Sequence, residues 1–409
     1  MFKSIVEAVS WLESQSRFRP KTSLDYILNA YNLLDLDFSK TKKIHVAGTN
    51  GKGSTSAFIT KVLVDNNISV GTFTSPYLVT FNERIRVNNK NISDKDLLNN
   101  INYFYQLNEE LYSKYEYRLS FFEIITLMSL KHFSDSKVEV IVIEVGIGGR
   151  LDATNILEYD VSIITSIGLD HMTQLGDTLE LITNEKLGIL KPKGYLVSAV
   201  EAPIKTQMIN YANKLKVKHK FVKSRDIFAV TPNSFYYLDQ LFEVGLLGDY
   251  QRKNALIAYY AVKHLFKISD DKIIESLKST KWDGRLEEVF PDVYLDGAHN
   301  IPAMEALMRN IEYIFKDKKI TILFSALKDK EIAKMLEEIT KYNYDIVLTS
   351  FPDFRFQNLK DYSNDRIKYL EDGYKTFKKL VSIKKEDEVI IATGSLHFIG
   401  YLKQNINNN

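Results

Sequence analysis

Short apolar runs rich in β-branched residues alternate along the chain with stretches whose apolar residues recur at helical spacing. Buried strands are predicted at Ile44–Ala47, Val70–Thr74, Val138–Val145, Val161–Ile167 and Leu196–Val200. Helices are predicted between them and beyond, at Ser54–Asn66, Ser93–Tyr112, Phe121–Ser134 and Thr178–Leu190. Such alternation is typical of βαβ crossovers, so we predict a largely parallel, doubly wound sheet with helices on both faces.

A second alternating series follows Trp282-Asp283-Gly284. Its predicted strands are Val293–Leu295, Ile320–Ser325, Ile346–Ser350 and Val389–Thr393, and its predicted helices are Ile301–Ile314, Lys330–Thr340 and Tyr362–Leu380. Between the two series, the aromatic stretch Phe235–Gly248 is hairpin-like and precedes a predicted helix from about Arg252 to Phe266. The pattern therefore indicates two α/β domains, with the boundary close to Gly284.

Composition narrows the classes of protein that this chain can belong to. The 409 residues carry 54 Lys+Arg against 52 Asp+Glu, so global charge favours neither a nucleic-acid nor an anionic-membrane partner. There is no cysteine, which excludes disulfides and thiolate ligands and is compatible with a reducing compartment, so we expect a cytoplasmic protein. Met1–Ser14 is amphipathic and lacks a secretory core, and no apolar run approaches the ~18 residues of a membrane span.

A glycine-rich loop follows the first predicted strand. The run Gly48-Thr49-Asn50-Gly51-Lys52-Gly53-Ser54 leads directly into a predicted helix. Glycines let backbone N–H groups wrap a phosphate, the helix N-terminus favours negative charge, and a lysine and a hydroxyl reach phosphate and magnesium. Gly53 separates Lys52 from Ser54, so the loop is a variant of the common Gly-Lys-Ser/Thr form, and a simple tight turn is the alternative.

Glu144 and His171 are expected near that loop because parallel strands end at one edge of the sheet, and Lys186 is a third feature to be explained. Glu144 ends a buried strand and needs a metal or cation as a partner, unless it lies at a surface edge. His171 follows the next strand, as a metal ligand or a structural hydrogen-bonding residue. Lys186 lies in an amphipathic helix and by itself would be a solvated lysine. The nearby Gly146-Ile147-Gly148-Gly149 is not a dinucleotide fingerprint, because Leu151 replaces its third glycine.

Together these motifs resemble the Mur-ligase-like family, most closely its folylpolyglutamate and dihydrofolate synthases. The matching stretches keep the family's order and are His45–Ser54, Thr74–Leu78, Phe81–Ile85, Phe121–Glu123, Glu144–Asn155, Gly168–His171, Glu185–Ile189, Gln251–Ala255, Gly284–Glu287 and Asp296–Asn300. The resemblance covers the chain from about Tyr26 to His397. It implies a P-loop nucleotide domain at residues 1–284 and a smaller Rossmann-like domain at residues 285–409.

The resemblance also implies roles for individual residues. Gly48–Ser54 would hold the ATP phosphates, Lys52 would neutralise the terminal ones, and Ser75, Glu144 and His171 would surround two magnesium ions. Lys186 matches the lysine that this family carbamylates, so Lys52, Lys186 and His171 are the candidate catalytic residues. The residues expected to contact ATP from across the domain interface are Asn254, Arg285, Asp296 and His299. Those expected to border the substrate are Phe81, Arg84, Phe121, Phe122 and, as a dihydropteroate contact, Asp152.

The implied activity belongs to folate biosynthesis and one-carbon metabolism: ATP-dependent addition of L-glutamate to dihydropteroate, reduced folates or both, through an acyl phosphate. Only 47 residues precede Gly48, which disfavours the UDP-sugar domain of cell-wall ligases. The loop Gly149–Asn155 looks like that of bifunctional enzymes, and the alternatives are a synthase acting on folates only or a non-catalytic ATP-binding protein. The expected partners are small molecules, and the expected state is a monomer.

Overall fold

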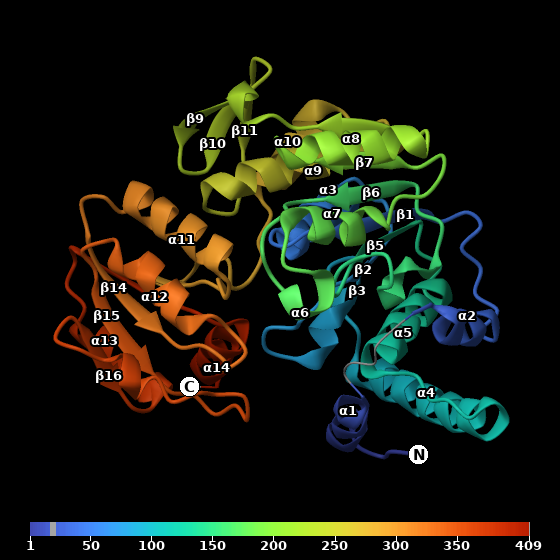
Figure 1. Cartoon of the computed structure of the whole chain (residues 1–409), viewed down its shortest axis with the longest axis horizontal. Coiled ribbons are helices and arrows are strands. Elements are labelled where there is room, and N and C mark those ends of the chain that lie inside the picture. The colour runs from blue at the N-terminus through green and yellow to red at the C-terminus, as the bar shows by residue number, and fades with distance from the viewer. Residues whose placement is uncertain (17–21, 409) are drawn as a thin grey trace. The chain divides into compact units, whose positions relative to one another are not determined.

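The computed structural model describes residues 1–16 and 22–408, and its contacts divide the chain into two compact units (Figure 1). The first unit comprises Met1–Ile227 and Lys253–Thr280, and the second comprises Phe228–Arg252 and Lys281–Asn409. The aromatic hairpin region thus groups with the C-terminal half. A domain boundary at residue 284 stays a prediction.

The first unit is built on a sheet in the order β4-β3-β2-β5-β1-β6-β7-β8. Its strands are β1 (Lys42–Ala47), β2 (Val70–Phe73), β3 (Ile85–Val87), β4 (Lys90–Asn91), β5 (Val140–Glu144), β6 (Val161–Ile164), β7 (Tyr195–Ser198) and β8 (Lys218–Phe221). Parallel pairing joins β2, β5, β1, β6, β7 and β8 in that order. The strands β3 and β4 extend the β2 edge of the sheet and pair antiparallel. The predicted doubly wound sheet is therefore confirmed.

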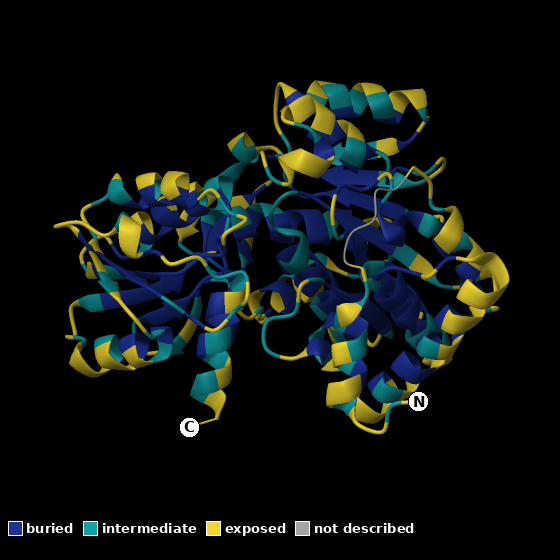
Figure 2. Ribbon diagram, turned by 60° about the horizontal axis from the view of Figure 1, so that its bottom comes forward, coloured by how far each residue is buried: buried dark blue, intermediate teal, exposed yellow. Residues whose placement is uncertain are grey.

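Helices cover both faces of this sheet (Figures 1 and 2). They are α1 (Ile5–Ser14), α2 (Asp25–Asn32), α3 (Lys52–Asp65), α4 (Asp94–Tyr115), α5 (Phe121–Asp135), α6 (Met172–Leu175), α7 (Leu179–Leu187), α8 (Ile204–Lys214) and α10 (Asp270–Lys278), with short 3-10 turns η1 (Phe81–Arg84), η2 (Ala153–Ile156) and η3 (Ser224–Asp226). Ile141 and Ile143 of β5 pack with α4 and α5 in one core, and Leu196 of β7 packs with α7 and α8 in another. Burial of these apolar faces is what stabilises the layers.

Local sequence explains where the helices near the site begin. Ser120 accepts the N3 backbone N–H of α5, and Glu123 reaches back to the backbone N–H of Ser120 at 2.8 Å, which completes a capping box. Thr178 accepts from the backbone N–H of Leu181 and caps α7. These caps satisfy backbone donors that a helix N-terminus leaves unpaired.

The second unit holds a sheet in the order β12-β13-β17-β14-β15-β16 and a three-stranded sheet β11-β10-β9. Its strands are β9 (Ile227–Thr231), β10 (Ser234–Tyr237), β11 (Gln240–Glu243), β12 (Glu287–Phe290), β13 (Val293–Leu295), β14 (Lys319–Phe324), β15 (Asp345–Thr349), β16 (Ile367–Leu370) and β17 (Glu388–Thr393). Its helices are α11 (Ile301–Ile314), α12 (Ile332–Thr340), α13 (Gly373–Ile383) and α14 (Leu396–Asn407), with η4 (Lys360–Tyr362), and α9 (Asp249–Leu265) runs across the division between the units. The second α/β domain is confirmed.

One predicted helix was wrong. Residues 362–380 do not form a single helix, because β16 pairs in parallel with β15 and α13 starts only at Gly373, capped by Asp372. Ile367 is buried and Lys368 is exposed, so the segment has the period-two pattern of a strand, which is too short to distinguish easily from a helix turn. Across residues 1–16 and 22–408, no helix combines the length and the hydropathy needed to traverse a bilayer.

Candidate active site

The predicted phosphate loop leaves β1 and turns sharply into α3. Gly48 has φ of 151° and Gly51 has φ of 89°, both in the region that favours glycine. A Cβ at Gly48 would lie 1.9 Å from Thr165 Oγ1, and a Cβ at Gly51 would lie 2.6 Å from Asn254 Oδ1. Both glycines are therefore needed for two reasons: the loop adopts their positive φ angles, and it packs closely against other segments of the protein.

The segment after β6 holds this loop in place. Thr49 Oγ1 donates to the carbonyl oxygen of Gly168 at 3.1 Å, and the Gly168 N–H donates back to Thr49 Oγ1 at 3.0 Å. The Asn50 N–H donates to Ser166 Oγ at 2.9 Å, and Thr165 Oγ1 donates to the Asn50 carbonyl oxygen at 2.6 Å. The loop is thus preorganised by hydrogen bonds that do not depend on a ligand.

Lys52 opens α3, with Gly53 and the buried Ser54 in the same helical turn. Its ammonium donates to the carbonyl oxygens of Gly48 at 3.0 Å and Thr49 at 3.3 Å. The positive charge is therefore held directly over the loop, where a phosphate would lie.

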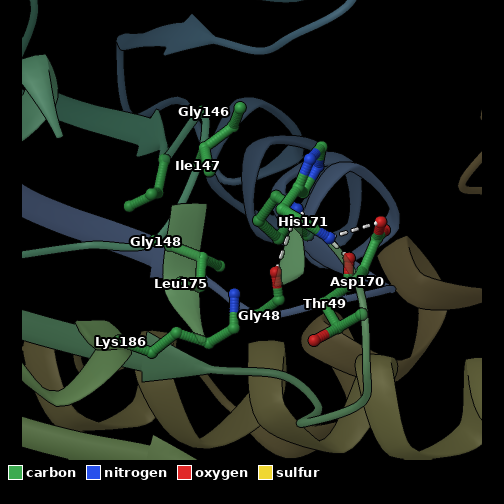
Figure 3. A pocket seen from close by; sticks show the side chains of 11 residues that line it. Gly48, Thr49, Gly146, Ile147, Gly148, Asp170, His171, Leu175 and Lys186 are labelled. Atoms are coloured by element: carbon green, nitrogen blue, oxygen red, sulfur yellow. Dashed lines mark hydrogen bonds between the residues drawn. The ribbon is translucent and has the colours of Figure 1, made fainter. Parts of the chain in front are cut away.

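A pocket forms where the loop meets the ends of β5 and β6 (Figure 3). It offers about 260 Å³ of empty space, which includes open solvent, and is lined by Gly48, Thr49, Lys52, Val145, Gly146, Ile147, Gly148, Asp170, His171, Leu175 and Lys186. Figure 3 shows Lys186 and His171 reaching the same space as Gly48 and Thr49. The structure thus brings Lys52, His171 and Lys186 to one pocket. Strand-end geometry predicted this position for His171, whereas only the family resemblance placed Lys186 here.

Lys186 is not the solvated lysine that its helix pattern alone would suggest. It is buried, with 4% of its surface exposed. Burial, reinforced by the nearby charge of Lys52, lowers the pKa of its amine from 10.5 to about 7, while Asp170 and Asp152 oppose that shift. A large fraction of this amine is therefore neutral near neutral pH and able to act as a nucleophile.

Glu144 and Ser75 meet at the ends of the adjacent strands β5 and β2. The Ser75 N–H donates to Glu144 Oε2 at 3.1 Å, and Glu144 is only 4% exposed. Within the described residues no three His, Asp or Glu side chains converge as a self-sufficient metal site. A buried carboxylate at a strand end nonetheless fits Mg²⁺, which is held by one or two carboxylates and completed by substrate phosphates.

Part of the predicted substrate set forms an aromatic cluster around a cation. The guanidinium of the buried Arg84 lies 4.9 Å from the ring centroid of Tyr77, 5.2 Å from that of Phe81 and 5.5 Å from that of Phe121. Phe122 packs against Gly146, where an added Cβ would lie 2.5 Å from Phe122 Cζ. The cluster offers planar apolar surface with a fixed positive charge, which suits a flat heteroaromatic group.

Asp152 is buried and its carboxylate already binds the chain. Oδ2 accepts from the Ile147 N–H at 3.0 Å, and Oδ1 accepts from the backbone N–H of Thr154 at 3.0 Å and from its hydroxyl at 2.6 Å. These bonds cap η2 and hold the glycine-rich loop after β5. A direct contact between Asp152 and dihydropteroate stays a prediction.

The remaining predicted nucleotide residues lie on two units. Asn254 belongs to the first, on α9 beside Gly51. In the second, Asp296 accepts the N–H groups of Leu286 and Ala298, each at 2.9 Å, and burial raises the pKa of its carboxyl, partly offset by Arg285. The Arg285 guanidinium donates to the Gly284 carbonyl oxygen at 2.9 Å, and His299 Nδ1 lies 2.7 Å from the Gly297 carbonyl oxygen. Their roles toward ATP stay predictions.

The sequence interpretation left out several residues that the structure places at the site. Asp170 lines the pocket beside His171, and its position in the Gly168–His171 match was a usable signal. Thr165 and Ser166 bind the phosphate loop from the segment after β6, but nothing in their spacing marks them as partners of Asn50. Such long-range hydrogen bonds appear only after the strand order is known.

Replacing Gly48 by alanine should weaken nucleotide binding while the domain stays folded. The new methyl group would collide with Thr165 Oγ1, at 1.9 Å, so the loop must shift. Because backbone strain of this kind costs about 1–3 kcal/mol, ADP affinity should fall by about tenfold or more. Calorimetric titration with ADP measures this, with thermal unfolding as the folding control. Wild-type ADP affinity in the variant would mean that the loop does not bind the phosphates.

Comparison with known proteins places these features in a family. The Mur ligase middle domain matches residues 46–262, and the Mur ligase glutamate ligase domain matches residues 284–396. The chain is 36% identical to the dihydrofolate synthase/folylpolyglutamate synthase of Bacillus subtilis (strain 168), over 99% of this chain and 100% of that relative.

Solved structures agree over nearly the whole length. Folylpolyglutamate synthase from Thermotoga maritima is similar with a TM-score of 0.83 and 27% identity, covering 98% of this chain and 96% of that one. Mycobacterium tuberculosis folylpolyglutamate synthase complexed with ADP is similar with a TM-score of 0.88 and 25% identity, covering 99% and 98%. The chain therefore belongs to the Mur ligase family, within its group of folylpolyglutamate and dihydrofolate synthases.

Proposed function

We propose that this protein is an ATP-dependent ligase that forms an amide between the amino group of L-glutamate and the carboxyl group of dihydropteroate or of a reduced folate. The observation that carries the proposal is the pocket in which Lys52 and the phosphate loop meet His171 and Lys186. The whole-length similarity to the Bacillus subtilis bifunctional enzyme supports the substrate class.

The chemistry requires activation of a carboxylate, whose oxygen is a poor leaving group. The substrate carboxylate attacks the γ-phosphorus of ATP, the bond to the bridging oxygen breaks, and ADP leaves with an acyl phosphate remaining. The glutamate amine then attacks the acyl carbon, losing a proton, and inorganic phosphate departs. Lys52 over the loop stabilises the charge on the transferring phosphoryl group, so positioning and electrostatics account for the catalysis.

A divalent metal fits this site. Glu144, Ser75 and His171 would hold it, since Glu144 is a buried carboxylate that meets Ser75 at the ends of β5 and β2, and His171 follows β6 in the same sheet. Magnesium bound there would neutralise part of the negative charge on the phosphates. A second ion near Lys186 is part of the proposal and depends on the carbamate described next.

We propose that Lys186 is carbamylated: its neutral amine adds CO₂, a proton is released, and the amine becomes an anionic carbamate. Because burial lowers its pKa to about 7, the reactive neutral form increases as the pH rises through that value. Enzyme depleted of CO₂ should regain activity when bicarbonate is added so that dissolved CO₂ is equal at both pH values, and faster at about pH 8 than at about pH 6, where the protonated amine dominates. Activity independent of bicarbonate, with no CO₂ adduct on Lys186 by mass spectrometry, would exclude the modification.

The function is tested with purified protein, ATP, magnesium, glutamate and either dihydropteroate or a reduced folate. Phosphate release together with amide product is expected with both acids, because the chain has the Gly149–Asn155 loop that resembles bifunctional enzymes. Product from the folate alone would identify a folylpolyglutamate synthase without the dihydropteroate activity. ATP binding without phosphate release or amide would identify a non-catalytic nucleotide-binding protein. We also propose that the protein acts as a monomer.

A further inference from the structure

A buried chain of polar groups leads to Asp152 from His45 and Thr154, two residues without a role so far. His45 lies on β1, three residues before the phosphate loop, and is completely buried. Its Nε2 lies 2.7 Å from Thr154 Oγ1, and that hydroxyl lies 2.6 Å from Asp152 Oδ1. The other Asp152 oxygen accepts the N–H of Ile147, a residue of the pocket wall.

The hydrogen-bond directions along this chain are determined by counting protons. An ionised Asp152 can only accept, so the single hydrogen of the Thr154 hydroxyl is donated to it. Thr154 Oγ1 must then accept from His45, which requires the imidazole proton on Nε2. Nδ1 of His45 is buried and has no hydrogen-bond partner among the described residues, in keeping with an unprotonated nitrogen there.

The surroundings keep His45 neutral and fixed. Its ring stacks on Tyr159, with centroids 4.0 Å apart and planes inclined by 16°, and the Tyr159 hydroxyl donates to the Thr154 carbonyl oxygen at 2.6 Å. Burial, and to a lesser degree the charge of Lys191, holds the pKa of the imidazole well below 6.5. Thr154 is thus held at its hydroxyl by His45 and at its backbone by Tyr159.

We propose that His45 and Thr154 are positioning residues that hold the Asp152 carboxylate in line with the Ile147 N–H and so fix the Gly146–Gly149 wall of the nucleotide pocket. Asp152 holds that wall at two points, because its Oδ2 accepts the Ile147 N–H at 3.0 Å and its own N–H donates to the Gly149 carbonyl oxygen at 3.1 Å. The direction of Oδ2 depends on how Thr154 holds Oδ1, through its N–H and its hydroxyl. The inference rests on the proposed function for its ADP-binding and kinetic readouts.

The imidazole is tested directly in the wild-type protein. In protein labelled with ¹⁵N at histidine, the NMR signals of His45 should show the neutral form with the proton on Nε2, unchanged across the range in which exposed histidines titrate. A proton on Nδ1, or titration of His45 with the exposed histidines, would overturn the relay. This experiment needs no ligase activity, so it stands apart from the proposed function.

The coupling to the pocket is tested by deleting one hydroxyl. Thr154→Val keeps the shape of the side chain and removes the donor to Asp152, whereas Thr154→Ser keeps the hydroxyl. Thr154→Val should weaken ADP binding and lower kcat/KM for ATP by about tenfold or more, since small misplacements at a site have large effects, with KM for glutamate unchanged. Thr154→Ser should restore both values to near wild type.

Thr280→Val is the matched control, because Thr280 is also buried and donates its hydroxyl to a backbone carbonyl oxygen, that of Ser276. The proposal predicts that both valine variants lose a comparable amount of Tm and that only Thr154→Val loses ADP affinity. That result would support a role of Thr154 in positioning the Asp152 carboxylate. Equal ADP affinity in the two valine variants, or an equal loss in Thr154→Val and Thr154→Ser, would overturn it. If Thr154→Val does not fold, the NMR result still decides the relay, because a proton on Nδ1 or titration of His45 would overturn it.

Discussion

Replacing Lys52 by alanine should reduce ATP-dependent phosphate release by about 100- to 1000-fold or more, the usual cost of removing one preorganised group from a transition state. The Lys52 ammonium lies over the phosphate loop, 3.0 Å from the Gly48 carbonyl oxygen, with no second lysine on that loop. Its charge opposes the negative charge that gathers on the γ-phosphoryl group. Steady-state phosphate release with saturating glutamate and folate measures the effect.

Lys61→Ala is the control for Lys52→Ala. Lys61 lies on the same helix, α3, and pairs with Asp65 at 2.6 Å, away from the pocket lining. It should turn over at the wild-type rate, because a surface ion pair of this kind contributes little. Near-normal turnover in Lys52→Ala would remove the phosphate loop from the mechanism.

Lys186→Arg should be nearly as inactive as Lys186→Ala, with kcat lowered by about 100-fold or more, as expected when a group that supports transition-state charge is lost. Arginine keeps the positive charge at this buried position but cannot form a lysine carbamate. If Lys186 served only as a cation beside the phosphates, arginine would preserve much of the activity. Lys186→Arg and Lys186→Ala together thus distinguish a carbamate at this position of the pocket from a simple cation.

Chemical rescue provides the control for Lys186. A small carboxylate such as acetate fits the space left by Lys186→Ala and would replace the missing anion, so it should raise the activity of that variant. It should leave Lys52→Ala unchanged, since that variant lacks a cation. Substantial activity in Lys186→Arg without any additive would contradict the carbamate.

The fold was predictable where apolar runs were long and bounded by turns. The valine- and isoleucine-rich run at residues 138–145 contains β5, and the capping residues Ser120 and Thr178 stand directly before α5 and α7. The strand β16 was missed because four residues do not distinguish a period of two from a helical turn. Strand order also lay beyond the sequence pattern, because pairing is decided by tertiary packing.

The positions of site residues could be predicted where those residues follow the ends of parallel strands. Residues after β1 and β6 had to meet at one edge of a parallel sheet, and the structure places Lys52 and His171 in one pocket. The environment of Lys186 was not predictable, because an amphipathic helix pattern does not say that its lysine is buried. The same holds for His45, whose importance depends on a hydrogen bond to a residue more than a hundred positions away.

Transfer of oxygen from the substrate carboxylate to phosphate tests the central claim most directly. Dihydropteroate labelled with ¹⁸O in its carboxyl group is incubated with the enzyme, ATP, magnesium and glutamate, and the released phosphate is analysed by mass spectrometry. An acyl phosphate requires that each phosphate released with amide formation carry one oxygen from the carboxylate. Amide product accompanied by unlabelled phosphate would contradict the account.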